Sequence, residues 1–146
     1  MRILEIDAQG GGIGKQLVAA IKRDLPEIEI TAVGTNSVAT GAMLKAGADY
    51  AATGENAVMV GARKADIITG PVGIVISDSL YGEITPAMVL AVAQSNAKRI
   101  LIPFNHCDNI IVGMSDLSIG KLIQSTVEEI KKALHNEAAS VRIDVR

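Results

Sequence analysis

Hydrophobic residues along the chain fall into short apolar runs that alternate with segments of helical spacing. The apolar runs predict strands at residues 2–6, 28–33, 49–52, 66–70 and 99–104. Apolar residues at helical spacing predict helices over residues 13–25, 37–46, 85–97 and 118–135, with a further short helix after residue 54. Strands that alternate with helices in this way indicate a parallel sheet with right-handed crossovers.

Three segments are less regular. The apolar run at residues 73–77 would extend the preceding strand after a kink or form the start of a buried helix, and the strand is favoured. The run at residues 109–113 favours a further strand. Residues 137–146 alternate apolar and polar side chains and are interpreted as a tail with a possible edge strand. Such a strand would pair with its own sheet or with a partner subunit, or the tail would stay loose. We therefore expect a single domain over residues 1–136, followed by this tail.

Composition supports the same architecture. The chain has 146 residues, of which 49% are hydrophobic and only 2% aromatic, so that aliphatic side chains dominate. Helices that cover both faces of a parallel sheet need this composition. The predicted fold class is α/β, a Rossmann-like doubly wound domain with a mainly parallel sheet and helices on both faces.

Charge and hydropathy exclude several classes of partner. The net charge is −2 without a basic run, which argues against nucleic acid. Apolar stretches are too short to span a bilayer, and a strand pattern begins without a signal peptide, so we expect no membrane partner. One cysteine suits a reducing compartment, which predicts the cytoplasm. Because the helix over 85–97 is apolar almost all round, it is either sandwiched in the domain or buried against another copy, and we expect a homo-oligomer.

The segment DAQGGGIGKQ, residues 7–16, lies between the first strand and the first helix. Glycine lets the backbone approach a phosphate closely, and the N–H groups of a following helix attract the anion. In a doubly wound sheet, ligands sit beyond the carboxyl ends of the strands. The predicted nucleotide or anion site therefore combines this loop with residues at the ends of later strands: Gln9, Gly10, Gly11, Gly12, Ile13, Gly14, Lys15, Thr35, Asn36, Ser37 and Gly70.

No established nucleotide fingerprint fits this loop fully. The dinucleotide pattern G-x-G-x-x-G places either Gln9 at its first glycine or Lys15 at its third. The Walker A pattern lacks its first glycine and has Gln16 where a magnesium-binding hydroxyl belongs. The short-chain dehydrogenase pattern matches only at its end, and its Tyr-x-x-x-Lys pair is absent. The cofactor is therefore left open, with NAD(P) suspected. Asp7 would repel a pyrophosphate unless it binds a metal or caps the N–H groups of the loop, and capping is favoured.

Residues that could supply chemistry are few. His106 and Cys107 follow a predicted strand, and Glu83 lies in a predicted loop that faces the crevice. An imidazole, a thiol and a carboxylate are possible acid, nucleophile and base, and these are the weak catalytic candidates. A loop with a small buried thiol and a carboxylate that caps a helix are the favoured alternatives. With one cysteine and two histidines in the chain, no metal site is predicted.

Several blocks of the sequence resemble a small family of bacterial proteins catalogued as a domain of unknown function. These blocks are DAQGGGIGKQ, GTNSVATGAMLKAGA, ATGENAV and ADIITGPVGIVISDSLYGEITPAM. The resemblance covers roughly residues 1–132, and family members have Gly where Ala8 stands. It implies a Rossmann-like fold and a compact cytoplasmic protein. It implies no reaction and no catalytic residue.

Two hypotheses of different class follow. The favoured one is a binding or regulatory protein that senses a nucleotide, phosphate or small anion, as a homodimer. The missing dehydrogenase pair and the missing magnesium hydroxyl favour it. The alternative is an NAD(P)-dependent enzyme or enzyme component, with chemistry from the loops at 77–83 and 105–107.

Overall fold

A computed structural model describes residues 1–103, 109–114 and 117–144 of the chain, with side chains described through residue 137. The strands are β1 (Arg2–Asp7), β2 (Glu29–Gly34), β3 (Tyr50–Thr53), β4 (Ile67–Pro71) and β5 (Lys98–Ile102). The helices are α1 (Gly12–Asp24), α2 (Ser37–Lys45), α3 (Glu55–Lys64), η1 (Val72–Val75), α4 (Pro86–Gln94) and α5 (Ile119–Asp144). The strands predicted at 2–6, 28–33, 49–52, 66–70 and 99–104 are all present, displaced by no more than a residue or two at their ends.

All strand pairs in the sheet are parallel, and the strand order is β3-β2-β1-β4-β5. The chain therefore runs outward from β1 to β3 and then returns to the other side of β1 with β4. This reversal between β1 and β4 is the topological switch point, where ligands bind in doubly wound folds. The predicted α/β, Rossmann-like fold is confirmed.

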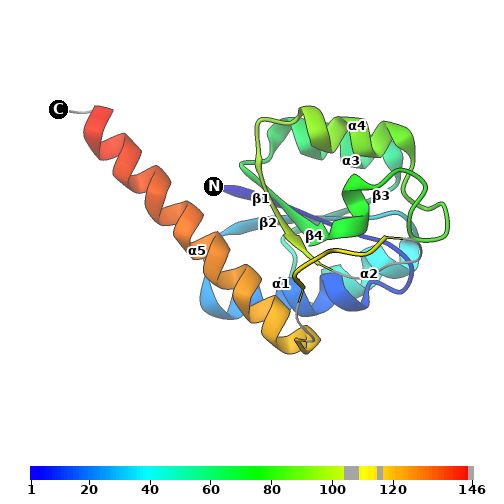
Figure 1. Cartoon of the computed structure of the whole chain (residues 1–146). Coiled ribbons are helices and arrows are strands. Elements are labelled where there is room, and N and C mark those ends of the chain that lie inside the picture. Colours follow the sequence, from blue (N-terminus) through cyan, green and yellow to red (C-terminus); the bar gives the residue numbers. More distant parts are fainter. Residues whose placement is uncertain (104–108, 115–116, 145–146) are drawn as a thin grey trace.

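Helices cover both faces of the sheet (Figure 1). Helices α3 and α4 lie on one face, and α1, α2 and α5 lie on the other. Alternate residues of β1 enter the two cores because successive strand residues point to opposite faces. Ile3 packs with α1 and α5 residues such as Ile21 and Val127, whereas Leu4 packs with Val58 of α3 and with α4.

Parallel register brings the ends of three strands to one edge of the sheet. Asp7 of β1 is paired with Gly34 of β2, which is paired with Thr53 of β3. The loops that follow these strands lie along this carboxyl edge, together with the segment after Pro71 of β4. The sequence motifs that were expected to form a site are therefore carried on neighbouring loops.

The strand predicted at residues 73–77 is wrong. The chain leaves the sheet after Pro71 and forms the 3₁₀ helix η1 instead. Its buried residue Ile74 packs into the core under α4, which explains the apolar run. A short apolar run fits a buried strand and a buried helical turn equally well, so periodicity could not separate them.

Two predictions near the carboxyl terminus are also wrong. At residues 109–113 only Asn109 has a bridge partner, and Ile110 and Val112 are exposed rather than inserted in a sheet. The tail at 137–146 is no edge strand, because α5 continues without a break to Asp144; residues 145–146 lie outside the described part. Within the described ranges, no helix has both the length and the apolar content needed to cross a membrane.

Candidate functional site

The loop between β1 and α1 makes a tight turn against α2. The N–H of Gly11 donates to the carbonyl of Ala8 at 3.0 Å, and Gly11 has a left-handed φ of 71°. A Cβ added to Gly11 would lie 2.8 Å from the Cα of Ala39 on α2. Gly11 is therefore required by the fold itself, through both its conformation and its contact.

Asp7 caps this loop from inside. Its Oδ1 accepts the N–H of Ala8 at 2.8 Å, and its Oδ2 accepts the N–H of Gly14 at 2.7 Å. Gly14 has no room for a side chain, because a Cβ there would approach Asp7 and Met43 within 3 Å. Burial raises the pKa of the Asp7 carboxyl, the two backbone N–H bonds oppose that rise, and the charge of Glu83 adds to it. Capping was the favoured interpretation of Asp7, and these two hydrogen bonds show how the carboxylate caps the loop.

Three backbone N–H groups of the loop face no acceptor in the described part of the chain: those of Gly10, Gly12 and Ile13. They lie at or just before the first turn of α1, where the helix dipole concentrates partial positive charge. Added Cβ atoms at Gly10 and Gly12 would meet nothing within 4 Å, so the space beside both residues is open. These groups form a donor set that can bind an anion.

The donor set lines a crevice of about 240 Å³ at the switch point. Its walls are residues 7–13, Gln16 of α1, Pro71 at the end of β4, Leu80 and Ile119. Leu80, from the loop before α4, and Ile119, at the start of α5, add apolar side chains to the crevice. Sequence reasoning missed Gln16, Pro71, Leu80 and Ile119. The one available signal was that Pro71 ends a strand at the carboxyl edge.

Glu83 ties three loops together at this edge. Its Oε2 accepts the N–H of Gln9 at 3.0 Å, and its Oε1 accepts the Thr35 hydroxyl at 3.0 Å and the Asn36 amide at 2.6 Å. The Asn36 amide also donates to the carbonyl of Gln9 at 2.9 Å. Gln9, Thr35, Asn36 and Glu83 were predicted site residues, and the structure brings them into one network. Their mutual contact could not be read from the sequence.

The segment that carries Glu83 folds back on itself in an unusual conformation. Asp78, Leu80 and Tyr81 have left-handed φ values of 65°, 56° and 58°. The N–H of Asp78 donates to the carbonyl of Ile84 at 2.8 Å, which closes the loop. Left-handed conformations cost L residues about 1–2 kcal/mol each. The loop therefore keeps Glu83 and Leu80 at the crevice although three of its residues adopt a strained backbone conformation.

Other predicted site residues lie elsewhere. Lys15 and Ser37 are exposed and line a separate shallow groove between α1 and α2, together with Lys45. Gly70 is buried in β4, and a Cβ there would lie 2.3 Å from the carbonyl oxygen of Ile6, so it allows β1 and β4 to approach. His106 and Cys107 lie outside the described residues.

A buried polar pair lies on the α1 side of the sheet, below Asp7. Glu5 of β1 and Thr69 of β4 are register partners, and both are inaccessible to solvent. Neither the two carboxyl oxygens of Glu5 nor the Thr69 hydroxyl has a hydrogen-bond partner in the described part of the structure. Burial raises the pKa of the Glu5 carboxyl well above its usual range, and the charge of Asp7 raises it further. Burial and the neighbouring Asp7 therefore both favour the uncharged form of the Glu5 carboxyl.

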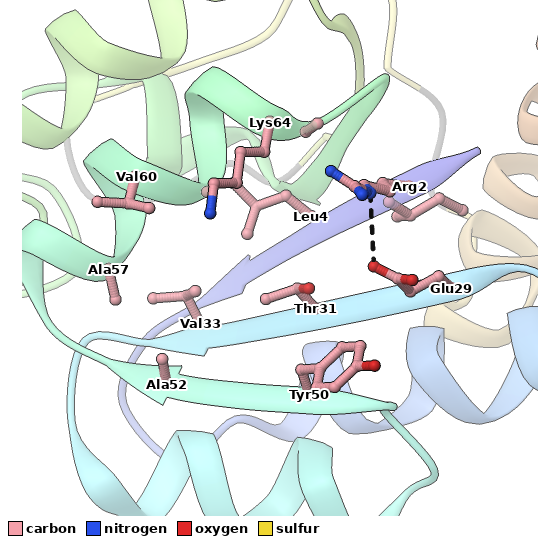
Figure 2. A pocket seen from close by; sticks show the side chains of 13 residues that line it. Arg2, Leu4, Glu29, Thr31, Val33, Tyr50, Ala52, Ala57, Val60 and Lys64 are labelled. Atoms are coloured by element: carbon pink, nitrogen blue, oxygen red, sulfur yellow. Dashed lines mark ion pairs between the residues drawn. The ribbon is translucent and has the colours of Figure 1, made fainter.

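A larger groove lies away from the carboxyl edge, between α3 and the face of β1, β2 and β3 (Figure 2). Its floor is formed by Leu4, Thr31 and Val33, and the ion pair of Arg2 with Glu29, at 3.7 Å, crosses one end. It contains none of the predicted site residues. We assign the candidate site to the crevice rather than to this groove, because the crevice contains the predicted loop and its backbone N–H groups without an acceptor in the described part of the chain.

The whole chain was also compared with known proteins. The family described as Domain of unknown function (DUF3842) matches residues 2–135. The chain belongs to this family. No curated protein matches the DUF3842 chain. A solved structure with a similar fold is titled as a dodecameric FMN-dependent Ubix-like decarboxylase from Escherichia coli O157:H7. It is 16% identical, with a TM-score of 0.43 over 91% of this chain and 76% of that chain.

Proposed function

We propose that this protein binds the phosphate group of a small ligand, a mononucleotide or another phosphorylated molecule, in the crevice between the glycine loop and β4. The observation that carries the proposal is the set of three N–H groups, of Gly10, Gly12 and Ile13, that lie at the start of α1 and have no acceptor among the residues that the structure describes. Backbone N–H groups at a helix start bind phosphate through their partial positive charge.

The arrangement of acidic groups supports a phosphate in this crevice. The carboxylate of Asp7 accepts hydrogen bonds from the N–H groups of Ala8 and Gly14, and these donors inside the loop stabilise its negative charge. Glu83 accepts the N–H of Gln9, and it does not accept a hydrogen bond from the three N–H groups of the donor set. Among the described lining residues there is no lysine or arginine, so the backbone supplies the attraction for the anion.

The position of Glu83 favours a mononucleotide over a dinucleotide. In dinucleotide-binding domains, a residue at the end of the second strand binds the adenosine ribose. Here Thr35 and Asn36 stand at the end of β2, and their side chains already donate to Glu83. NAD(P) would have to displace this carboxylate, whereas a ligand confined to the side of β4 would not.

We favour a binding or regulatory role in the cytoplasm over catalysis. The carboxyl groups at the described crevice are those of Asp7 and Glu83. Asp7 already accepts two backbone N–H groups, and Glu83 already accepts hydrogen bonds from three neighbouring donors. A sensor needs only that the ligand stabilise the loops that Glu83 ties together. An enzyme would need a further reactive group beside the bound ligand.

The test is ligand-induced stabilisation in matched glycine variants. We expect the wild-type protein to be stabilised by at least one of ATP, GTP, FMN, NAD(H), NADP(H) or inorganic phosphate in a thermal shift assay. A ligand present at about 100 times its dissociation constant should add about 2.7 kcal/mol. Gly12→Ala should keep its fold, since the added methyl meets no protein atom, but should lose this stabilisation because the methyl enters the crevice.

Gly41→Ala is the matched control. Gly41 lies on α2, and its added Cβ also meets nothing within 4 Å, yet it does not line the crevice. This variant should respond to the ligand as the wild type does. An absence of stabilisation by every compound, or an equal response from Gly12→Ala and the wild type, would contradict the proposal.

A further inference from the structure

Helix α4 presents an uncharged outer face to solvent. Its sequence, PAMVLAVAQ, contains no charged residue. Met88 and Val92 are buried against η1 and α3, but Leu90 is 56% exposed, and Ala93 is exposed beside it. A helix that is apolar all round is ordinarily covered on all sides. The sequence predicts that this helix is buried either within the domain or against another copy of the protein. In the structure, the domain buries the side of α4 that carries Met88 and Val92, and Leu90 on the outer side stays exposed.

A groove of about 400 Å³ runs between α3 and α4 next to Leu90. Met59 of α3 and Ala87 and Ala91 of α4 form much of its lining, and the small side chains of the alanines leave it open. A protruding leucine beside a groove of small residues is a self-complementary shape. Two copies related by a twofold axis can each insert Leu90 into the groove of the other.

The charges at the two ends of α3 are also self-complementary. The N-termini of α3 and α4 lie together, since the Thr85 hydroxyl, which caps α4, donates to Glu55 at 2.5 Å. Arg63 lines the opposite end of the groove with Gln94 and carries no ion pair in the described structure. Glu55, Met59 and Arg63 are spaced at four-residue intervals along one face of α3. An antiparallel pairing therefore brings Glu55 of each copy to Arg63 of the other.

We propose that the outer face of α3 and α4 is a homodimer interface in which two copies pack antiparallel about a twofold axis near Leu90. Apolar contact at the centre and two symmetric Glu55–Arg63 pairs at the rim give an interface with a buried core and a polar edge, as protein interfaces have. The carboxyl-edge crevice lies beyond the helix starts, so ligand binding does not require this surface.

The first test is the oligomeric state. Light scattering coupled to size exclusion should give a dimer for the wild-type protein at micromolar concentration. Leu90→Glu should raise the dimer dissociation constant about tenfold or more, because it places a charge in the apolar centre. Tyr50→Glu is the matched control, since Tyr50 is 61% exposed in the groove of Figure 2 and should leave the dimer intact. Circular dichroism verifies that both variants fold.

The second test uses the symmetry of the charges. Arg63→Glu alone and Glu55→Arg alone each place like charges opposite one another, and each homodimer should weaken about three- to tenfold. When the two variants are mixed, both rim pairs regain opposite charges. Native mass spectrometry should then show a heterodimer in excess of either homodimer. A monomeric wild-type protein, a dimer that survives Leu90→Glu, or a random mixture of the charge variants would overturn the proposal.

Discussion

Glu5 shows how a single buried acid can make the stability of this protein depend on pH. Its carboxyl is inaccessible to solvent and has no hydrogen-bond partner within the described ranges, so ionisation in the folded state would leave an uncompensated charge. In the unfolded chain the same group titrates near its ordinary pKa of about 4.3. Because burial raises the pKa in the folded protein, the folded state keeps a proton that the unfolded state has lost. The free energy of unfolding therefore falls as pH rises between these two pKa values.

We predict that Glu5→Gln flattens this dependence and stabilises the protein at pH 7 by about 1 kcal/mol. Urea unfolding measured from pH 4.5 to 8 provides the comparison. The free energy of unfolding of Glu5→Gln should still depend on pH to some extent, because the pKa of Asp7 is also raised. Glu27→Gln is the control, because Glu27 is exposed and should leave the curve unchanged. A Glu5→Gln curve parallel to the wild-type curve would show that Glu5 ionises in the folded state without cost.

At the scale of elements, the loop between η1 and α4 holds the most strained backbone near the site. Asp78, Leu80 and Tyr81 all adopt left-handed φ values, but only Leu80 is buried. Tyr81 is 88% exposed, so its side chain contributes little packing that would offset its conformation. The strain is balanced by the hydrogen bonds of Glu83 to the two neighbouring loops.

Tyr81→Gly should therefore stabilise the protein by about 0.5–1 kcal/mol, since glycine adopts this φ without a steric cost. The gain is less than the full cost of the left-handed residue because glycine also has more freedom in the unfolded chain. Tyr50→Gly is the control: Tyr50 is similarly exposed but lies in β3, where glycine weakens a strand. A loss of stability in Tyr81→Gly would mean that the tyrosine side chain has contacts that outweigh its strain.

Helix α5 divides into a packed part and a projecting part. Among the side chains described through residue 137, the buried apolar residues of α5 are Ile123, Val127, Ile130 and Ala133, and they pack against α1 and β5. In Figure 1 the remaining turns run away from the sheet toward the carboxyl terminus. The domain boundary at residue 136 stays a prediction.

Deletion of residues 137–146 should change the free energy of unfolding by less than about 0.5 kcal/mol, as surface changes commonly do. Ile130→Ala on the packed part should instead cost about 2–5 kcal/mol, because it opens a cavity beneath the helix. Denaturant unfolding of the two variants, followed by circular dichroism, separates these effects. A large loss upon deletion would place residues 137–146 within the cooperative unit.

For the whole molecule, the sequence was most informative about features that the apolar pattern and the turn residues of the same segment both indicate. Apolar runs located all five strands of the sheet, and turn residues placed the glycine loop at the carboxyl edge of β1. These features depend on neighbours in sequence, which is why local chemistry was enough to predict them.

Features that depend on distant contacts could not be predicted. Glu83 and Gln9 are separated by 74 positions, and nothing local indicates that one carboxylate accepts from two loops. The alternation in residues 137–146 fits an edge strand when read alone, yet the continuing helix of α5 determines the conformation through Asp144. Lys15 in the first turn of α1 and Ser37 at the start of α2 line a different groove from the crevice, which their positions in the sequence do not show.

We propose above that a phosphate binds the N–H groups of Gly10, Gly12 and Ile13, which have no acceptor in the described part of the chain. Amide chemical shifts measured by two-dimensional ¹⁵N NMR during a titration with inorganic phosphate, and then with the nucleotide that stabilises most, test it directly. We predict saturable shifts at Gly10, Gly12 and Ile13, with smaller changes at Gly14, whose N–H is held by Asp7. Unchanged shifts at these three residues up to millimolar ligand, or shifts confined to the groove of Lys15 and Lys45, would contradict the account.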